Sequence, residues 1–186
     1  MAQINVAGDT SGSVAIVAPA VAGTPTLTLP TVSGTFITTG SSGQSIPKAA
    51  LPTGSVLQVQ QSTSTTSFST TSSTLVDSGI SASFTPLYSS SKVLIIVVAN
   101  VNPAANGAGF GLYRGTTQIF SPMPSDGSGF YGVYPSIIVQ TPLTYLDSPA
   151  TTSATTYRLY FSSRSGLTST IGGGGTTQFV FMEIAA

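Results

Sequence analysis

This chain of 186 residues contains no cysteine, no histidine and no tryptophan, and only five basic and five acidic residues. Without Cys or His it has no thiolate nucleophile, no disulfide, no imidazole base and no customary zinc ligand. A formal net charge of zero gives no electrostatic attraction to nucleic acid or to an anionic membrane. We therefore expect a protein that is not an enzyme, with no catalytic residue, cofactor or metal, and with neither nucleic acid nor membrane as a partner.

Helical patterning is also missing. No window of eleven or more residues places apolar side chains at helical spacing, and Gly or Pro interrupts nearly every candidate. The longest apolar run, residues 93–99, is too short to span a bilayer. Instead, the chain has 29 Ser, 28 Thr and many short β-branched or aromatic runs bounded by Gly, Pro, Asn and Ser. That pattern predicts an all-β protein.

The first 38 residues differ from the rest. PAVAGT at residues 19–24 recurs as PTVSGT at residues 30–35, and residues 26–29 alternate polar and apolar as a half-buried strand does. The segment is too short to enclose a core, so we interpret residues 1–38 as an extended β arm that buries its apolar side chains against other copies or a larger assembly. The residues expected to be buried are Val14, Ile16, Val21, Leu27, Leu29, Val32, Phe36 and Ile37.

Two further regions follow the arm. Residues 39–54 are rich in Gly, Ser and Pro and are either a linker or an ordered extended loop packed on a neighbour. Residues 55–186 contain about eight or nine short strands with turn signals between them, which predicts a β-sandwich of jelly-roll type. Residues 92–101 are nearly all apolar and fit a central strand covered on both faces. Pro135 and Pro142 are expected to interrupt the strand region at residues 130–146.

No motif in the chain indicates chemistry. The five acidic residues are far apart in sequence and are expected to be solvated loop or turn residues. A carbohydrate-active enzyme, which we regard as the least favoured function, would need two of these carboxylates paired in a groove. Gly172–Gly175 has no accompanying lysine and no following helix, so we interpret it as a hairpin loop rather than a phosphate cradle.

Aromatic residues concentrate between residues 110 and 134. Tyr rings offer an apolar face and a polar tip, which suits contact with a sugar or a protein receptor. Tyr113, Tyr131 and Tyr134 are therefore candidate receptor-facing residues. The alternative, which we favour, is that these rings pack the sandwich or a subunit interface.

Parts of the sequence resemble a known family. Residues 12–35, GSVAIVAPAVAGTPTLTLPTVSGT, are similar to an N-terminal segment of virion proteins from tailed bacteriophages. LPTGSVLQV at residues 51–59, YLDSPATTSATTYRL at 145–159 and MEIAA at 182–186 resemble a C-terminal module of phage fibre-like and head-decorating proteins. The resemblance implies a trimeric virion surface protein that is anchored by its N-terminal part, and it implies no catalytic residues.

These observations lead to one preferred function and one alternative. The preferred function is a homotrimeric capsid decoration, or cement, protein that binds the major capsid protein or another virion protein through residues 1–38. The alternative is a short tail or head fibre that binds a host surface glycan or protein through loops such as residues 102–109 and 122–129. Because the chain is short, with one arm and one sandwich and no shaft, we expect it on the head surface rather than the tail. Residues 1–8 show no secretion signal, so we expect synthesis in the host cytoplasm.

Overall fold

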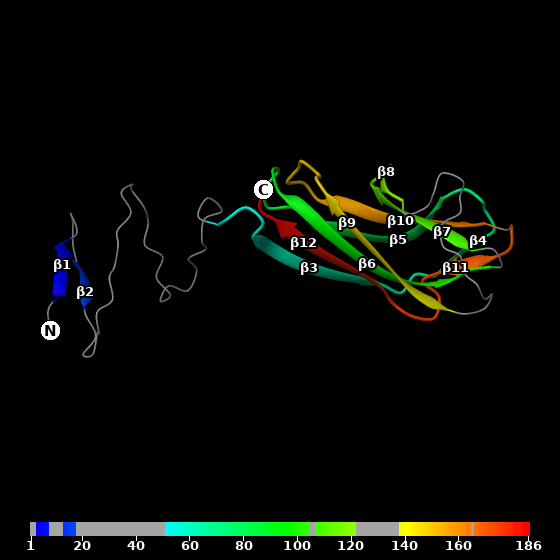
Figure 1. The fold of residues 1–186 in the computed structure, drawn as a ribbon, viewed down its shortest axis with the longest axis horizontal. Coiled ribbons are helices and arrows are strands. Elements are labelled where there is room, and N and C mark those ends of the chain that lie inside the picture. The colour runs from blue at the N-terminus through cyan, green and yellow to red at the C-terminus, as the bar shows by residue number, and fades with distance from the viewer. Residues whose placement is uncertain (1–2, 8–12, 18–50, 105–106, 122–137, 165) are drawn as a thin grey trace. The chain divides into compact units, whose positions relative to one another are not determined.

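The computed structural model describes residues 3–7, 13–17, 51–104, 107–121, 138–164 and 166–186 (Figure 1). The chain divides into two units, Met1–Gln44 and Ser45–Ala186. In the first unit, β1 (Gln3–Ala7) pairs antiparallel with β2 (Ser13–Val17), with Gln3 opposite Val17. The described residues include no helix that is long and apolar enough to cross a membrane.

The second unit is a sandwich of two antiparallel sheets, which confirms the predicted all-β class. The first sheet has the order β3-β12-β6-β9. The short β11 pairs with β6 beyond the end of β12, and β4 pairs with β11. The second sheet has the order β5-β10-β7-β8. The strands are β3 (Val56–Ser64), β4 (Phe68–Thr70), β5 (Val76–Phe84), β6 (Lys92–Asn102), β7 (Ala108–Arg114), β8 (Thr117–Phe120), β9 (Val139–Asp147), β10 (Thr155–Ser163), β11 (Ser169–Ile171) and β12 (Thr177–Ile184).

The connectivity between the sheets is that of a jelly roll. If β3 with β4, and β11 with β12, are each taken as one interrupted row, the described strands of this unit form eight rows. Numbered along the chain, these rows are β3/β4, β5, β6, β7, β8, β9, β10 and β11/β12. The first sheet then holds rows one, eight, three and six, and the second holds rows two, seven, four and five. The chain therefore crosses repeatedly between the sheets, as in the double Greek key of a jelly roll.

The core lies between the two sheets and follows from strict alternation along the strands. Residues at every second position of β6, β10 and β12 are buried, among them Ile95 of β6, Leu159 of β10 and Phe181 of β12. Phe181 is at the centre, with ring centroids of Phe84 and Tyr157 at 5.2 and 5.4 Å. Because aromatic rings bury large areas in fixed geometries, this cluster sets the spacing of the sheets.

The Gly172–Gly175 segment is not the predicted hairpin loop. β11 and β12 do not pair with each other, because both pair antiparallel with β6. Gly172 has φ of +77° and donates its N–H to the Asn100 carbonyl at 2.8 Å, and a Cβ there would lie 2.1 Å from the Thr66 carbonyl oxygen. Gly172 thus allows the chain to bend between β11 and β12 while its backbone stays in contact with Asn100 and Thr66.

Pro142 does not interrupt its strand either. β9 runs from Val139 to Asp147, and Pro142 lies opposite Val98 of β6. In the described residues β9 pairs only with β6, so it is an edge strand, where proline is tolerated with its missing N–H on the free side. Pro135 lies outside the described residues.

Glu183 is buried although it was expected to be solvated, and among the described residues no cation forms an ion pair with its carboxylate. It accepts hydrogen bonds from the backbone N–H groups of Leu87 and Tyr88 at 2.8–3.0 Å and from Gln58 Nε2 at 2.6 Å. Desolvation raises the pKa of this carboxyl, but these hydrogen bonds to the ionised form outweigh it, so the pKa is lower than its ordinary value of 4.5. The carboxylate thereby holds the β5–β6 loop against β3 and β12.

We predict that Glu183 makes the stability of the sandwich depend on pH. Since the folded pKa is depressed, the unfolded chain binds the proton more tightly. The stabilisation is complete above the unfolded value near 4.5 and is lost as the pH falls through the folded pKa. Urea unfolding at pH 6 and pH 3 should show a larger loss of unfolding free energy for the native chain than for Glu183→Gln. Equal losses in both proteins would contradict this role.

A pair of leucines tests the position of the core. Leu159 is 1% exposed and Leu167 is 54% exposed. Leu159→Ala should lower the free energy of unfolding by about 2–5 kcal/mol, because it removes buried methyl groups and leaves a cavity. The matched control Leu167→Ala should change it by less than about 0.5 kcal/mol. Chemical denaturation monitored by circular dichroism measures both, and similar losses would place the core elsewhere.

Candidate functional site

Most of the predicted arm residues lie outside the described parts of the chain. Val14 and Ile16 are in β2, where their backbones lie opposite Val6 and Ile4. Val21, Leu27, Leu29, Val32, Phe36 and Ile37 fall in residues that the structure does not describe. The burial of these eight side chains therefore stays a prediction.

Of the three candidate receptor-facing tyrosines, Tyr131 and Tyr134 lie outside the described residues. Tyr113 is half-buried on the outer face of β7, where its ring stacks on that of Tyr160 with centroids 3.6 Å apart. Its hydroxyl donates to Gln118 Oε1 at 2.8 Å. Desolvation, and to a lesser degree the Tyr160 hydroxyl, raises the pKa of Tyr113. The ring is thus held within the sheet surface by its neighbours.

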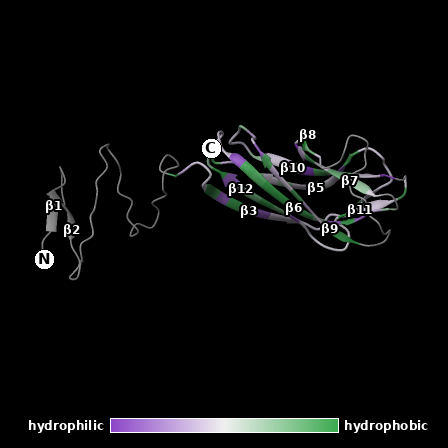
Figure 2. Ribbon diagram, in the orientation of Figure 1, coloured by the Kyte–Doolittle hydropathy of each residue, from purple (hydrophilic) through white to green (hydrophobic). Residues whose placement is uncertain are grey.

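The outer side of the β3-β12-β6-β9 sheet carries a second set of apolar side chains, which we term the outer apolar face. In β6 residues 93–99 are all apolar, and in β12 residues 179–182 and 184 are apolar, so the side chains opposite the core are apolar over this length (Figure 2). In register across the four strands lie Val59, Met182, Leu94 and Leu146. The face consists of Val56, Val59, Leu94, Ile96, Val98, Leu146, Val180, Met182 and Ile184.

The exposure of this face rises from its centre to its edges. The residues on the central strands β6 and β12 are half-buried by their neighbours. On the edge strands, Val56, Val59 and Leu146 are 52%, 60% and 47% exposed. The prediction that residues 92–101 form a central strand is thus correct, but within the described residues the sandwich covers only one of its faces.

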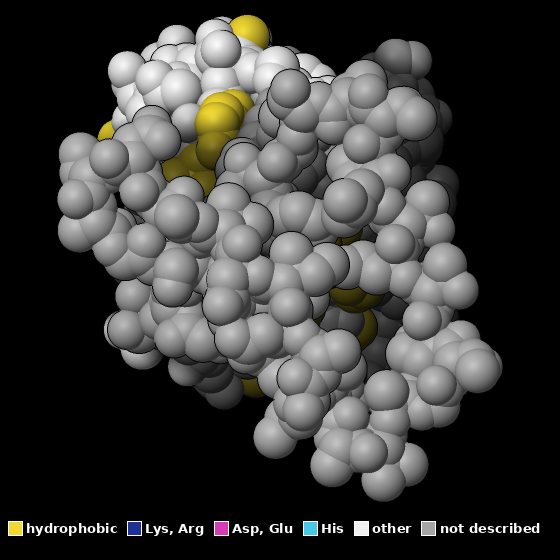
Figure 3. Space-filling model, turned by 90° about the vertical axis from the view of Figure 1, so that its left-hand side faces the viewer, with side chains coloured by type: hydrophobic (Ala, Val, Ile, Leu, Met, Phe, Trp, Pro, Cys, Tyr) yellow, Lys and Arg dark blue, Asp and Glu magenta, His cyan; other side chains and the backbone are white. Residues whose placement is uncertain are grey.

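Charge is nearly absent from the outer apolar face. Among the described residues on this side of the four strands only Lys92, the first residue of β6, carries a charge. The carboxylates of Asp147 and Glu183 point to the other side of the sheet. Figure 3 views the molecule from its end, where the described atoms in sight are hydrophobic or of other uncharged kinds. A face of this kind gains free energy when it is covered and meets no repulsion from an identical copy.

The size of the face can be estimated from strand geometry. Four strands about 4.8 Å apart, with three outward positions about 6.6 Å apart on each, give about 400 Å² for the sheet surface that holds these nine residues together with Gln61, Pro142 and Thr144. This is within the range of about 300–600 Å² found for the largest, often functional, patches of monomeric proteins. It is about half of the roughly 800 Å² that each partner buries in a standard interface.

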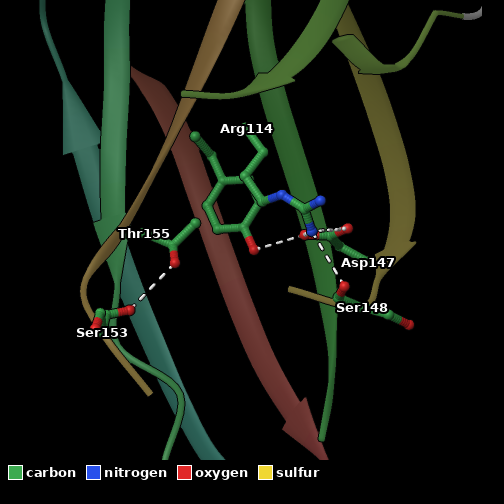
Figure 4. A network of polar contacts seen from close by, with 6 residues as sticks. Arg114, Asp147, Ser148, Ser153 and Thr155 are labelled. Atoms are coloured by element: carbon green, nitrogen blue, oxygen red, sulfur yellow. Dashed lines mark hydrogen bonds and ion pairs between the residues drawn. The ribbon is translucent and has the colours of Figure 1, made fainter. Parts of the chain in front are cut away.

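Two sheets are joined at one end by a polar network (Figure 4). Arg114 Nη1, at the end of β7, donates to both oxygens of Asp147, at the end of β9, at 3.0 Å, and to the Ser148 carbonyl at 3.1 Å. The Tyr157 hydroxyl donates to Asp147 Oδ2 at 2.9 Å. Desolvation is the larger cause that raises the pKa of Tyr157 well above its ordinary value of 10, and the Asp147 carboxylate raises it further. The phenol therefore stays protonated and remains a donor.

The positions of two acidic residues correct expectations from the sequence. Asp147, expected to be a solvated turn residue, is buried and paired with Arg114. Asp77 is half-exposed, as a loop residue would be, but lies in β5 and pairs with Arg158 at 3.1 Å. No cluster of three potential metal ligands occurs in the described part of the chain. Asp9 and Asp126 lie outside it.

Sequence reasoning missed the outer apolar face and the Arg114–Asp147 pair for different reasons. The sequence does carry a signal for the face, because polar and apolar residues do not alternate in β6 or in VFMEI at residues 180–184. The partners of the pair are 33 residues apart, and only the crossing of the chain between the sheets brings them together.

No protein-family model and no curated protein matches this chain. Among solved structures, the VP2 subviral particle of infectious bursal disease virus aligns at 14% identity and a TM-score of 0.38, covering 71% of this chain and 38% of that one. The T=1 particles derived from the same virus align at 13% identity and a TM-score of 0.40, covering 78% and 41%. This chain thus spans about two fifths of the viral chains it matches. At this level the similarity assigns neither a family nor a function.

Proposed function

We propose that this chain is a structural virion protein of a tailed bacteriophage, which decorates the capsid as a homotrimer. The outer apolar face carries the proposal, because an uncharged sheet face of this size favours burial against other protein. The resemblance of residues 12–35, 51–59, 145–159 and 182–186 to phage virion proteins supports the choice of virion. Residues 1–38 would bind the major capsid protein or another virion protein on the head surface.

Further copies of this chain are the occupants we assign to the outer apolar face. Three such faces turned toward one three-fold axis would bury one another in a shared core, and closed symmetry would leave no apolar face exposed. Since the face supplies about half the area of a standard interface, the remainder must come from other residues. The apolar side chains of residues 1–38 are suited to supply it.

Charged residues on the face test the trimer. Val59 and Leu146 are about half-exposed in the single chain, so Val59→Lys/Leu146→Lys should leave the sandwich folded while placing six charges in the shared core of a trimer. The double variant should sediment as a monomer, and the native chain as a trimer. Thr117→Lys, at an exposed position of β8, is the control and should remain trimeric. A trimeric double variant would refute this use of the face.

A truncation tests the anchor. A chain of residues 39–186 retains the whole sandwich core, so it should stay folded by circular dichroism. It should no longer co-sediment with phage heads that have been stripped of the native chain, whereas the full chain should bind them again. Equal occupancy by the truncated chain would show that residues 1–38 are not the anchor. Antibody labelling of virions viewed by negative-stain microscopy would separate head from tail.

A further inference from the structure

The outer side of the second sheet differs in character from the outer apolar face. Thr156, Arg158 and Tyr160 alternate along β10 with buried residues and therefore point outward. They line an open groove together with Asp77 of β5, the Gly115–Thr116 turn and the β9–β10 loop at residues 149–154. We term it the outer polar groove. Its lining includes no residue of the outer apolar face.

An aromatic ring of fixed orientation lies at one end of the groove. Tyr160 stacks on Tyr113 at an interplanar angle of 17°. Gly111 lies opposite Tyr160 in the neighbouring strand, and a Cβ at that position would lie 3.3 Å from Tyr113 Cε2. The missing side chain thus leaves room for the pair of rings. A ring already held in place loses little conformational entropy when a ligand packs on it.

The wall of the groove is also held in place. Arg114 Nη1 donates to the Ser148 carbonyl, and Thr155 Oγ1 donates to the Ser153 carbonyl at 3.2 Å (Figure 4). The Ser153 N–H donates to Thr151 Oγ1 at 3.0 Å. Within this loop Ala150 has a φ of +53°, which side chains with a Cβ adopt only at a cost of about 1–2 kcal/mol. Such strain persists where the surroundings determine the backbone, and it is often found at binding sites.

The groove offers many hydrogen-bonding groups and no unpaired charge among its described residues. Arg158 is paired with Asp77, and Arg114 with Asp147. The guanidinium of Arg158 has five N–H donors and the Asp77 carboxylate about four lone-pair sites, so their single contact at 3.1 Å leaves both free to bind more. Thr116, Thr151 and Thr156 also line the groove. An anionic ligand would find no free cation here.

We propose that the outer polar groove binds a neutral saccharide. Adjacent donors and acceptors on Arg158 and Asp77 match the vicinal hydroxyl groups of a sugar, and the C–H face of the sugar ring matches the apolar face of Tyr160. The groove is polar and partly aromatic, and its charged side chains are paired with one another or with Asp147. This is the chemistry of an uncharged polyhydroxylated ligand rather than of a phosphate or an acidic sugar. This inference goes beyond the assembly role and does not depend on it.

The experiment uses the full chain and a defined panel of probes. Saturation-transfer NMR with glucose, galactose, mannose, rhamnose, N-acetylglucosamine, maltose and lactose, each at about 10 mM to reveal even millimolar affinity, identifies a bound sugar. N-acetylneuraminic acid and inorganic phosphate serve as anionic probes. At least one neutral sugar should bind more tightly than either anion.

Two variants place the binding in the groove. Arg158→Gln removes the guanidinium at a half-exposed position, and Tyr160→Leu removes the flat ring but keeps an apolar side chain. Each should raise the Kd about tenfold, corresponding to loss of about 1.4 kcal/mol. Lys92→Gln, which removes a cation from the other sheet, should leave the Kd unchanged. The proposal is overturned if no neutral sugar binds, if an anion binds better, or if Arg158→Gln binds as the native chain does.

Discussion

The constraint on which this structure depends is that two of its central strands are apolar on both faces. In a sandwich only one face of each sheet meets the core, and alternation sends every second side chain of β6 and β12 to the other side. Inward, these strands supply Ile95 and Phe181 to the core, and outward they supply Ile96 and Met182 to the outer apolar face. The same pattern that makes the fold stable therefore also creates a surface that is most stable when covered.

Two of the chain's five acidic residues, Asp147 and Glu183, are buried inside the sandwich. Glu183 and Asp147 lie in register on either side of Val93, both directed inward. Glu183 is satisfied by backbone N–H groups and Gln58, and Asp147 by Arg114 and Tyr157. Because a buried carboxylate without such donors would be costly, these two residues fix how the β5–β6 loop and the ends of β7 and β9 are placed. Ser and Thr keep much of the outer surface polar instead.

The all-β class and the jelly roll could be predicted because alternation and turn residues are local signals. The errors concern features that depend on distant parts of the chain. Whether Gly172 turns a hairpin or bends a row depends on β6, against which both flanking strands pair. Whether Asp147 is solvated depends on Arg114 in the other sheet. The outer polar groove combines β5, β10 and two loops, and no single stretch of sequence contains enough of it to be recognised.

Pro142 has a further consequence for how copies of this chain can associate. The two sheet edges that run beside the outer apolar face are formed by β3 and β9. A free strand edge is a template for open-ended addition of strands from other chains, and proline blocks it because it offers no donor there. β9 carries this block at its middle, while β3 is continuous from Val56 to Ser64 without proline. Strands from other chains therefore cannot add continuously to the β9 edge. Neighbouring copies can accumulate at high density without that edge starting the growth of fibrils.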